Sequence, residues 1–501
     1  MVFNSGVYIY FLGFVLLVYW LLYTLPNGVK LQNRFLLVAS YLFYGYWDWV
    51  FLLLIALSTG IDYFAALKIE KSDKLSHKKL YLSLSVIFNL GTLGTFKYYD
   101  FFISEFVDLC RNINPALFPE GGDSLLLNVI LPVGISFYTF QTMSYTIDVY
   151  RKQIPAEKNL FDFSLFVCFF PQLVAGPIER AGILLPQLKN PRKFDSQNFV
   201  EGAWLFLYGF FMKVFVADNL GFLVNLVFLD GKEVYKANPI LAYGHGGFQV
   251  FAATVAFAFQ IYCDFAGYSN IALGTARFLG IKLSTNFSTP QLSQNPAELW
   301  RRWHITLNRW VTDYIYIPLG GSRLGAFRKN LNLLIAFLLM GFWHGANWTF
   351  ILWGGFNGAV LILHNIFSRR LPDLSNSIHP FLHLQVRILK MIAVFLIFSF
   401  SGILFRCYDL NHTLYLSESL FTFPWDLSES INNVPAAGKY ATAILSKIAL
   451  LMILDISAYY YKDDFWIFKR PIWLRVIVYS SLFFAIVIMG FFGRDVIYFA
   501  F

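Results

Sequence analysis

Apolar stretches about as long as a bilayer is thick recur from one end of this chain to the other. A helix crosses the hydrocarbon core with about 20 residues, and roughly eleven to thirteen runs could span or enter a membrane. The runs lie near residues 7–25, 34–46, 49–67, 80–106, 125–147, 160–175, 199–228, 247–280, 331–366, 386–406, 439–461 and 472–492. Several are too long or too short for one span, which predicts broken or re-entrant segments that are buried in protein or line a wet cavity.

The composition leads to the same fold class. The 501 residues are 57% hydrophobic and 14% charged, whereas a soluble protein is roughly 45–50% apolar and about 25% charged. We therefore expect an all-α, polytopic membrane protein, and we treat residues 1–501 as one membrane domain. The net charge of +9 comes largely from Lys and Arg in short loops between apolar runs, as in cytoplasmic loops. No basic, aromatic-interleaved module indicates nucleic-acid binding.

The first candidate site is the basic-aromatic segment 300–317. Its aromatic and aliphatic residues recur with helical spacing, which predicts one amphipathic helix at a membrane surface that Pro318 ends. The apolar stripe consists of Trp300, Trp303, Leu307, Trp310, Tyr314 and Ile317, and the polar face of Arg301, Arg302, Arg309 and Asp313. His304 lies at the edge of the stripe, near Asn308. It is either a functional imidazole or an interfacial side chain with its polar tip in water.

The second candidate is His344, in Gly-Phe-Trp-His-Gly-Ala-Asn-Trp at residues 341–348. Apolar sequence lies on both sides of it. An ionisable residue in such a place is costly and by default faces a functional cavity. The alternative is a neutral histidine hydrogen-bonded between helices. Two histidines are too few for a standard zinc site, so no metal is expected.

Two further motifs interrupt apolar runs. Asp264, within 262–270, should face a partner or water. We expect it to pair with Arg277, Arg301 or Arg302, and a structural salt bridge is at least as plausible as a catalytic role. The segment 169–178 contains two prolines and a glycine, which predicts a re-entrant turn.

Four long motifs, in order, resemble the membrane-bound O-acyltransferase family, and most closely its bacterial alginate O-acetylation branch. They are FFPQLVAGPIERAGILLPQL at 169–188, YCDFAGYSNIALGTARFLGIKL at 262–283, WRRWHITLNRWVTDYIYIPLGGSR at 300–323 and MGFWHGANWTFILWGG at 340–355. The resemblance spans nearly the whole chain and is strongest at 165–365, which we take as the region of the catalytic core motifs. It implies helices around a central funnel or tunnel that holds an acyl-transfer site.

The resemblance also assigns residues. It implies that His344 is the main catalytic histidine and His304 the second. The C-terminal Tyr498 stands where the branch carries a tyrosine motif, although Ala500 replaces a Gln, and Tyr498 is a candidate acyl relay. Candidate donor or tunnel contacts are Arg301, Arg302, Trp303, Asp264 and Asn347.

These assignments predict an O-acyltransferase in the inner (cytoplasmic) membrane of a cell. Histidine, whose pKa is ordinarily near 6.5, is suited to remove a proton from an acceptor hydroxyl. The expected donor substrate is acyl-CoA, with acetyl-CoA as first choice, and no cofactor is expected. The expected partners are membrane lipid, an exported or cell-wall polysaccharide and an extracytoplasmic acetyltransferase of the secreted hydrolase-like type. The alternatives are a transporter or flippase without bond chemistry, and a structural scaffold.

Overall fold

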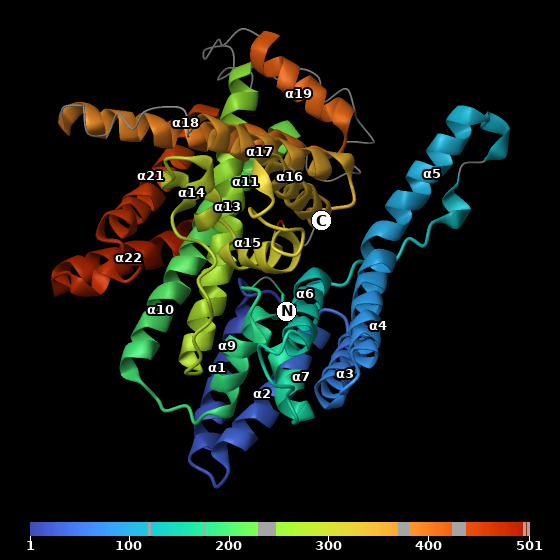
Figure 1. The fold of residues 1–501 in the computed structure, drawn as a ribbon. Coiled ribbons are helices and arrows are strands. Elements are labelled where there is room, and N and C mark those ends of the chain that lie inside the picture. Colours follow the sequence, from blue (N-terminus) through green and yellow to red (C-terminus); the bar gives the residue numbers. More distant parts are fainter. Residues whose placement is uncertain are drawn as a thin grey trace. The chain divides into compact units, whose positions relative to one another are not determined.

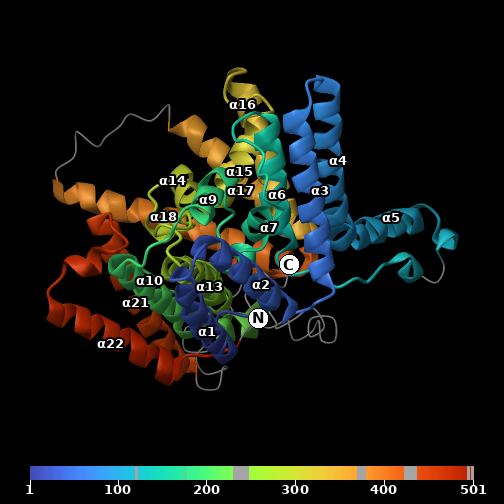
Figure 2. The same cartoon turned by 90° about the horizontal axis from the view of Figure 1, so that it is seen from below.

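The structure is a computed structural model (Figures 1 and 2). It describes residues 1–118, 122–174, 176–228, 247–368, 380–422, 437–493 and Ile497. Within these ranges the regular elements are all helical, which confirms the all-α fold class. The chain forms two compact units. The first contains Met1–Ala203 with Ala272–Ser284, and the second contains Trp204–Ile271 with Thr285–Ala500.

The first unit is built mainly from the N-terminal helices. They are α1 (Gly6–Tyr23), α2 (Gly28–Gly45), α3 (Phe51–Lys71), α4 (Leu75–Leu93), η1 (Gly94–Tyr98), α5 (Tyr99–Ile113), η2 (Pro115–Leu117), η3 (Asp123–Leu125), α6 (Ile135–Tyr150), α7 (Leu160–Cys168), α8 (Phe170–Leu173) and α9 (Ala181–Lys189). Helices α3 and α4 lie side by side (Figures 1 and 2). The predicted interruption at 169–178 is present, because α8 is a single buried turn and the chain is non-helical again before α9.

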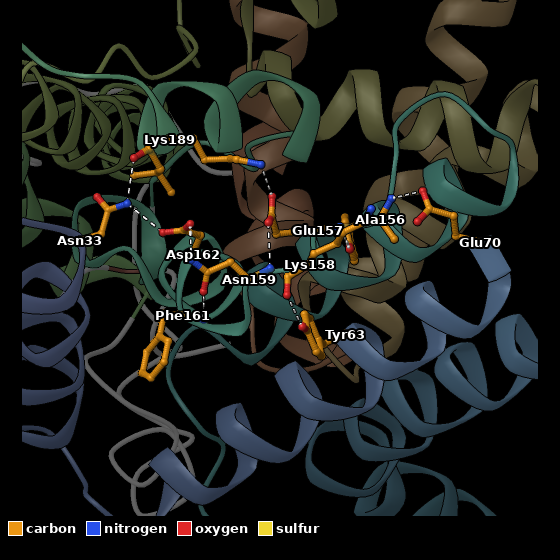
Figure 3. Close-up of polar contacts among 12 residues, drawn as sticks. Asn33, Tyr63, Glu70, Ala156, Glu157, Lys158, Asn159, Phe161, Asp162 and Lys189 are labelled. Atoms are coloured by element: carbon orange, nitrogen blue, oxygen red, sulfur yellow. Dashed lines mark hydrogen bonds and ion pairs between the residues drawn. The ribbon is translucent and has the colours of Figure 1, made fainter. Parts of the chain in front are cut away.

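Polar side chains fix the connection between α6 and α7 in this unit (Figure 3). The carboxylate of Glu70 accepts the Ala156 N–H at 2.9 Å. Glu157 forms an ion pair with Lys189 at 2.9 Å. The Asn33 amide donates to Asp162 at 2.9 Å. The loop is therefore tied to α3 and α9, and the first turn of α7, which follows the loop, is tied to α2.

The second unit carries both candidate histidines. Its helices are η4 (Phe211–Ala217), α11 (Asp218–Phe228), η6 (Pro290–Leu292), α14 (Pro296–Arg302), α15 (Ile305–Val311), η7 (Thr312–Tyr316), α16 (Gly325–His344), α17 (Trp348–Phe367), α18 (Pro380–Arg406), α19 (Leu410–Thr422), α21 (Ala437–Tyr461), η9 (Trp466–Lys469) and α22 (Ile472–Met489). Two helices, α10 (Ser196–Phe210) and α13 (Gly247–Phe278), contribute residues to both units.

Eight helices in the described part of the chain are long and apolar enough to cross a membrane. Many of their large apolar side chains are exposed, for example Phe14, Leu53, Ile453 and Ile488. Lipid tolerates such surfaces and water does not, so the chain is a multi-pass membrane protein. The predicted count of eleven to thirteen spanning or re-entrant segments, the central tunnel and the single 1–501 domain stay predictions.

Helices α16 and α17 form a hairpin that carries His344 (Figure 1). They pack against each other through glycines. A Cβ at Gly341 would collide with the carbonyl of Phe350, and one at Gly354 would collide with the carbonyl of Phe337. Small residues at such a crossing let two backbones approach closely within a membrane. This crossing sets the position of the turn between the two helices.

Candidate active site

His344 is the last residue of α16 and is 4% exposed. The helix stops there because Gly345 is extended, with φ −166°. Asn347 then caps α17, since its side-chain oxygen accepts the Thr349 N–H at 3.0 Å. The histidine therefore projects from a break between two apolar helices. A backbone break at membrane depth is tolerated where it is buried in protein or lines a cavity.

Aromatic rings surround the imidazole of His344. Its centroid is 4.9 Å from the ring of Trp343, 5.1 Å from that of Trp353 and 5.2 Å from that of Phe405. The last two contacts are edge-on, with interplanar angles of 87° and 72°. This arrangement fixes the plane of the imidazole and excludes bulk water from its flanks.

A small cavity adjoins this aromatic cluster. Its volume is about 10 Å³, which is close to the minimum that holds one water molecule. Trp353 and Phe405, which contact His344, are in its wall, together with Trp303 and Phe398. The Trp303 ring also lies 4.8 Å from that of Phe398. Trp303 thus lines this cavity, and its role as a donor or tunnel contact stays a prediction.

The predicted single helix over 300–317 is wrong. Helix α14 ends at Arg302, Trp303 is extended, and His304 is left-handed, with φ 43° and ψ 54°, before α15 begins. A non-glycine residue at positive φ is uncommon and indicates local strain. The first four residues of the apolar stripe, Trp300, Trp303, Leu307 and Trp310, are buried in protein, each under 9% exposed. The last two are not: Tyr314 is half-buried and Ile317 is exposed.

Two asparagines and an extended segment stabilise this break. The Nδ2 of Asn308 donates to the carbonyls of Trp300 and Trp303, at 2.9 and 2.6 Å, which the broken helix leaves unpaired. On the other side, the Ile305 N–H donates to the Asn286 carbonyl at 2.9 Å. The free-energy cost of interrupting the helix is thereby offset, because buried backbone groups keep partners.

Asn286 also fixes the protonation state of His304. Its Oδ1 accepts the Thr306 N–H at 3.3 Å and the Thr306 hydroxyl at 2.9 Å, and it lies 3.1 Å from His304 Nδ1. Because a backbone N–H can only donate, this Asn286 atom is an acceptor, and His304 Nδ1 carries the hydrogen. Burial lowers the pKa of His304 to about 3. The ring is therefore neutral near pH 7, with Nε2 as its acceptor nitrogen.

The two histidines share a neighbour. The Trp343 ring lies 4.9 Å from His344 and 6.2 Å from His304, between centroids. The edge of His304 also meets Phe265 of α13, with centroids 4.7 Å apart. Both predicted catalytic imidazoles thus belong to one buried aromatic cluster, contributed by α13, the α14–α15 break and the α16–α17 hairpin.

Arg302 and Arg301 differ in their surroundings. Arg301 is exposed. Arg302 pairs with Glu298 at 2.9 Å, donates to the Ser288 carbonyl at 3.1 Å and stacks 5.0 Å from the ring centroid of Tyr459. It lines a cavity of about 1010 Å³, whose wall also includes apolar residues of α18 and the acidic residues Asp463 and Asp464. Glu298 offsets part of the charge of Arg302, and the roles of Arg301 and Arg302 as donor contacts stay predictions.

Asn347 has structural partners. Besides capping α17, its Nδ2 donates to the Tyr408 carbonyl at 2.6 Å. These bonds hold the end of α18 against the start of α17. They give Asn347 a structural role in the turn that follows His344, and its role as a contact of the acyl donor stays a prediction.

The predicted arginine partners of Asp264 are wrong. Its carboxylate pairs with Lys213 of η4 at 2.6 Å. Arg277 pairs instead with Glu201, and Arg302 with Glu298. The lysine lies within the apolar run 199–228, and this is the signal that could have indicated the pair, since an ionisable residue there needs a partner.

The other predicted site residue, Tyr498, lies outside the described residues. Sequence reasoning missed Asn286, which sets the His304 tautomer, and Trp353 and Phe405, whose rings contact the imidazole of His344. No sequence pattern distinguishes these three residues from others of their type, and only the tertiary structure places them beside the histidines. Within the described residues, no group of three or more His, Cys, Asp or Glu side chains is arranged to hold a metal ion.

The described residues thus place two buried imidazoles in one aromatic cluster of a helical, multi-pass membrane protein. The chain belongs to the membrane-bound O-acyltransferase family, whose model matches residues 35–408.

Individual relatives agree with this assignment. The chain is 35% identical to a probable alginate O-acetylase of Pseudomonas aeruginosa, over 92% of this chain and 82% of the relative. It is 33% identical to a peptidoglycan O-acetyltransferase of Helicobacter pylori, over 83% of this chain and 78% of the relative. It is 29% identical to a teichoic acid D-alanyltransferase of Streptococcus thermophilus, over 50% of this chain and 60% of the relative. The predicted family and the prediction of an O-acyltransferase are confirmed, so the transporter and scaffold alternatives lose their support.

Proposed function

We propose that this enzyme passes an acetyl group from a cytoplasmic thioester, acetyl-CoA, across the inner membrane for O-acetylation of an exported or cell-wall polysaccharide, with His344 as general base. The carrying observation is the placement of His344 at the α16–α17 break, inside a cluster of aromatic rings. The names of the O-acetylating relatives support acetyl as the group and a polysaccharide as the acceptor.

The chemistry needs a base and a site that excludes water. His344 takes the proton of the acceptor hydroxyl, and the oxygen attacks the thioester carbonyl. The C–O bond forms, the C–S bond breaks, and the proton leaves with the thiol. The aromatic rings around His344 reduce competing hydrolysis, because water would otherwise accept the acyl group.

His304 acts as a hydrogen-bond acceptor toward the substrate. Its Nδ1 hydrogen is directed to Asn286, and Nε2 is the acceptor nitrogen. A neutral ring in this tautomer orients a hydroxyl by accepting its hydrogen bond. Stabilisation of the developing oxyanion then falls to a backbone N–H near this residue.

Arg302, and more peripherally Arg301, would meet the phosphates of the donor. The cavity of about 1010 Å³ beside Arg302 supports this role, because guanidinium groups suit phosphate recognition and the apolar wall suits the rest of an amphipathic donor. Trp303, which follows Arg302 in the chain, lines the small cavity together with Trp353 and Phe405, the two rings that contact His344.

The product path involves an extracytoplasmic partner. Tyr498 would carry the acyl group as a relay to a secreted hydrolase-like acetyltransferase, which would modify the polysaccharide. No cofactor beyond the donor substrate is needed, because the imidazole of His344 supplies the acid–base chemistry.

The test is the acetyl content of the exported polysaccharide in cells that carry His344→Ala. We expect ester to disappear while the protein stays in the membrane at its normal level. His364→Gln is the control, because His364 is a partly exposed histidine on α17 of the same hairpin. Full acetylation in a well-expressed His344→Ala strain contradicts the proposal.

A further inference from the structure

A single carboxylate lies buried in the first unit, far in sequence from both histidines. Asp62 is near the middle of α3, which is long and apolar enough to span a membrane, and its side chain is fully buried. Helices α4 and α6 both pack against α3. An ionisable residue within a membrane span is costly and is a functional candidate by default. The proposed transfer reaction gives Asp62 no role, so its burial needs another explanation.

Three hydrogen-bond donors converge on the carboxylate of Asp62. Its Oδ1 accepts the Ser85 hydroxyl and, at 3.2 Å, the Thr146 hydroxyl. Its Oδ2 accepts the Asn89 side-chain N–H at 2.8 Å. The same Asn89 nitrogen faces the Ser85 carbonyl at 3.0 Å, which can only accept, so this end of the amide is the NH2. Donors on both oxygens suit the ionised carboxylate, because that form only accepts.

The charge of Asp62 has no cationic side chain beside it. Its partners in the described part of the chain are two hydroxyls and an amide. An isolated ionised carboxylate in an apolar interior is very costly, and buried charges are therefore paired or coordinate a metal. Asp62 thus requires a cation from solution. A single charge is enough, because a divalent ion would leave one positive charge uncompensated.

The side chains around the carboxylate offer oxygen ligands. A hydroxyl that donates a hydrogen bond keeps its lone pairs, so the oxygens of Ser85 and Thr146 can coordinate a cation. Thr146 has a second acceptor for its hydrogen, the Thr142 carbonyl at 3.4 Å, which allows its oxygen to turn toward an ion. Asn89 Oδ1 is a further oxygen, and the Ser58 hydroxyl lies 3.0 Å from it. Carboxylate, carbonyl and hydroxyl oxygens are the ligands that hard cations prefer.

We propose that Asp62 is the centre of a binding site for one alkali-metal cation, Na⁺ or K⁺, among helices α3, α4 and α6. The Asp62 carboxylate supplies the negative charge. Ser85 and Asn89 of α4 and Thr146 of α6 supply neutral oxygens. The ion joins three helices of the first unit and stabilises their packing. This site is separate from the proposed acyl-transfer chemistry and does not depend on it.

The measurement is the thermal midpoint of the purified, full-length protein in detergent. NaCl or KCl replaces N-methyl-D-glucamine chloride at constant ionic strength. We expect at least one of the two alkali ions to raise the wild-type midpoint by about 3 °C at saturation, because a ligand that binds only the folded chain stabilises it. Asp62→Asn keeps the shape of the side chain and loses its charge, so its midpoint should not rise.

Two threonines give a matched comparison that leaves the charge in place. Thr146→Val deletes one proposed ligand oxygen and should need about tenfold more of the ion for half of the rise, since affinity depends on the number of ligands. Thr59→Val is the control. Thr59 is a buried residue of α3 that donates to the Ile55 carbonyl of its own helix at 2.7 Å. Its variant should respond to the ion as the wild type does.

Three results would each overturn the proposal. They are a wild-type midpoint that neither alkali ion raises, an equal rise in Asp62→Asn, and equal responses of Thr146→Val and Thr59→Val. The threonine pair decides the question even if Asp62→Asn does not fold. If the wild type transferred no acetyl group, the proposed function would fail while the ion response stood.

Discussion

His304 Nδ1 lies 3.1 Å from Oδ1 of Asn286, which the neighbouring Thr306 identifies as an acceptor. This contact makes Nδ1 the protonated nitrogen of the buried ring, and it joins the strained α14–α15 break to the extended segment before η6. It yields the first three predictions.

Replacing Asn286 should disturb both stability and activity. Asn286→Leu leaves the His304 Nδ1–H and the Thr306 donors without their shared acceptor, at a cost of about 1–3 kcal/mol for a buried unsatisfied group. We expect a lower thermal midpoint and slower acetyl transfer. Asn357→Leu is the control, because the buried Asn357 donates only within its own helix, to Trp353. Equal midpoints for the two variants would argue against the proposed role of Asn286.

His304→Asn should separate the backbone role of this residue from its chemistry. Asparagine tolerates a left-handed conformation better than most residues, so the break with φ 43° should persist. The thermal midpoint should stay near that of the wild type, while transfer falls by about 100-fold or more, because the acceptor nitrogen that orients the hydroxyl is lost. Valine is β-branched and tolerates the left-handed conformation poorly, so His304→Val should both lower the thermal midpoint and slow transfer. Wild-type transfer by the Asn variant would remove His304 from the mechanism.

The pKa of His304 sets a direction for the pH dependence of stability. Burial lowers the pKa in the folded protein to about 3, and the unfolded value is about 6.5. Between these values the unfolded chain binds a proton that the folded chain does not, so stability rises with pH across this window and falls as the solution is acidified from about 6.5. Thermal midpoints between pH 4 and 7 should fall more steeply with acid in the wild type than in His304→Asn. Parallel curves would contradict the assignment.

The α16–α17 crossing should tolerate no side chain at its closest points. Gly354→Ala drives a Cβ into the Phe337 carbonyl, and the backbones must separate. We expect a loss of about 1–3 kcal/mol, as for overpacking, measured as a lower thermal midpoint. Gly355→Ala is the matched control on the same helix, where the nearest atom, Leu338 Cδ2, is a movable side-chain end 3.3 Å away. Similar midpoints for the two variants would mean that the crossing is not tight.

The sequence predicted the parts of this protein that depend on local chemistry. Apolar runs predicted the helical membrane fold, and the cost of an ionisable residue among apolar ones singled out His344. The break at His304 was missed because the spacing of Trp300, Trp303 and Leu307 is genuinely helical. The bonds from Asn286 and Asn308, which come from tertiary structure, override that local preference.

The partner of Asp264 was missed for a related reason. The positive charges considered were the arginines near it in sequence or in motif, whereas Lys213 reaches it from a different helical turn, 51 residues away. Pairing between helices depends on their packing, which hydrophobic periodicity does not specify.

The central claim is that His344 is the base for acyl transfer. The most direct test is transfer of [14C]acetyl from acetyl-CoA by the purified chain in lipid nanodiscs, with a polysaccharide acceptor and a secreted acetyltransferase of the proposed type supplied. We predict that His344→Gln transfers at least about 100-fold more slowly than the wild type, while His364→Gln transfers at the wild-type rate. A His344→Gln protein that is folded and transfers acetyl as fast as the wild type would contradict the account.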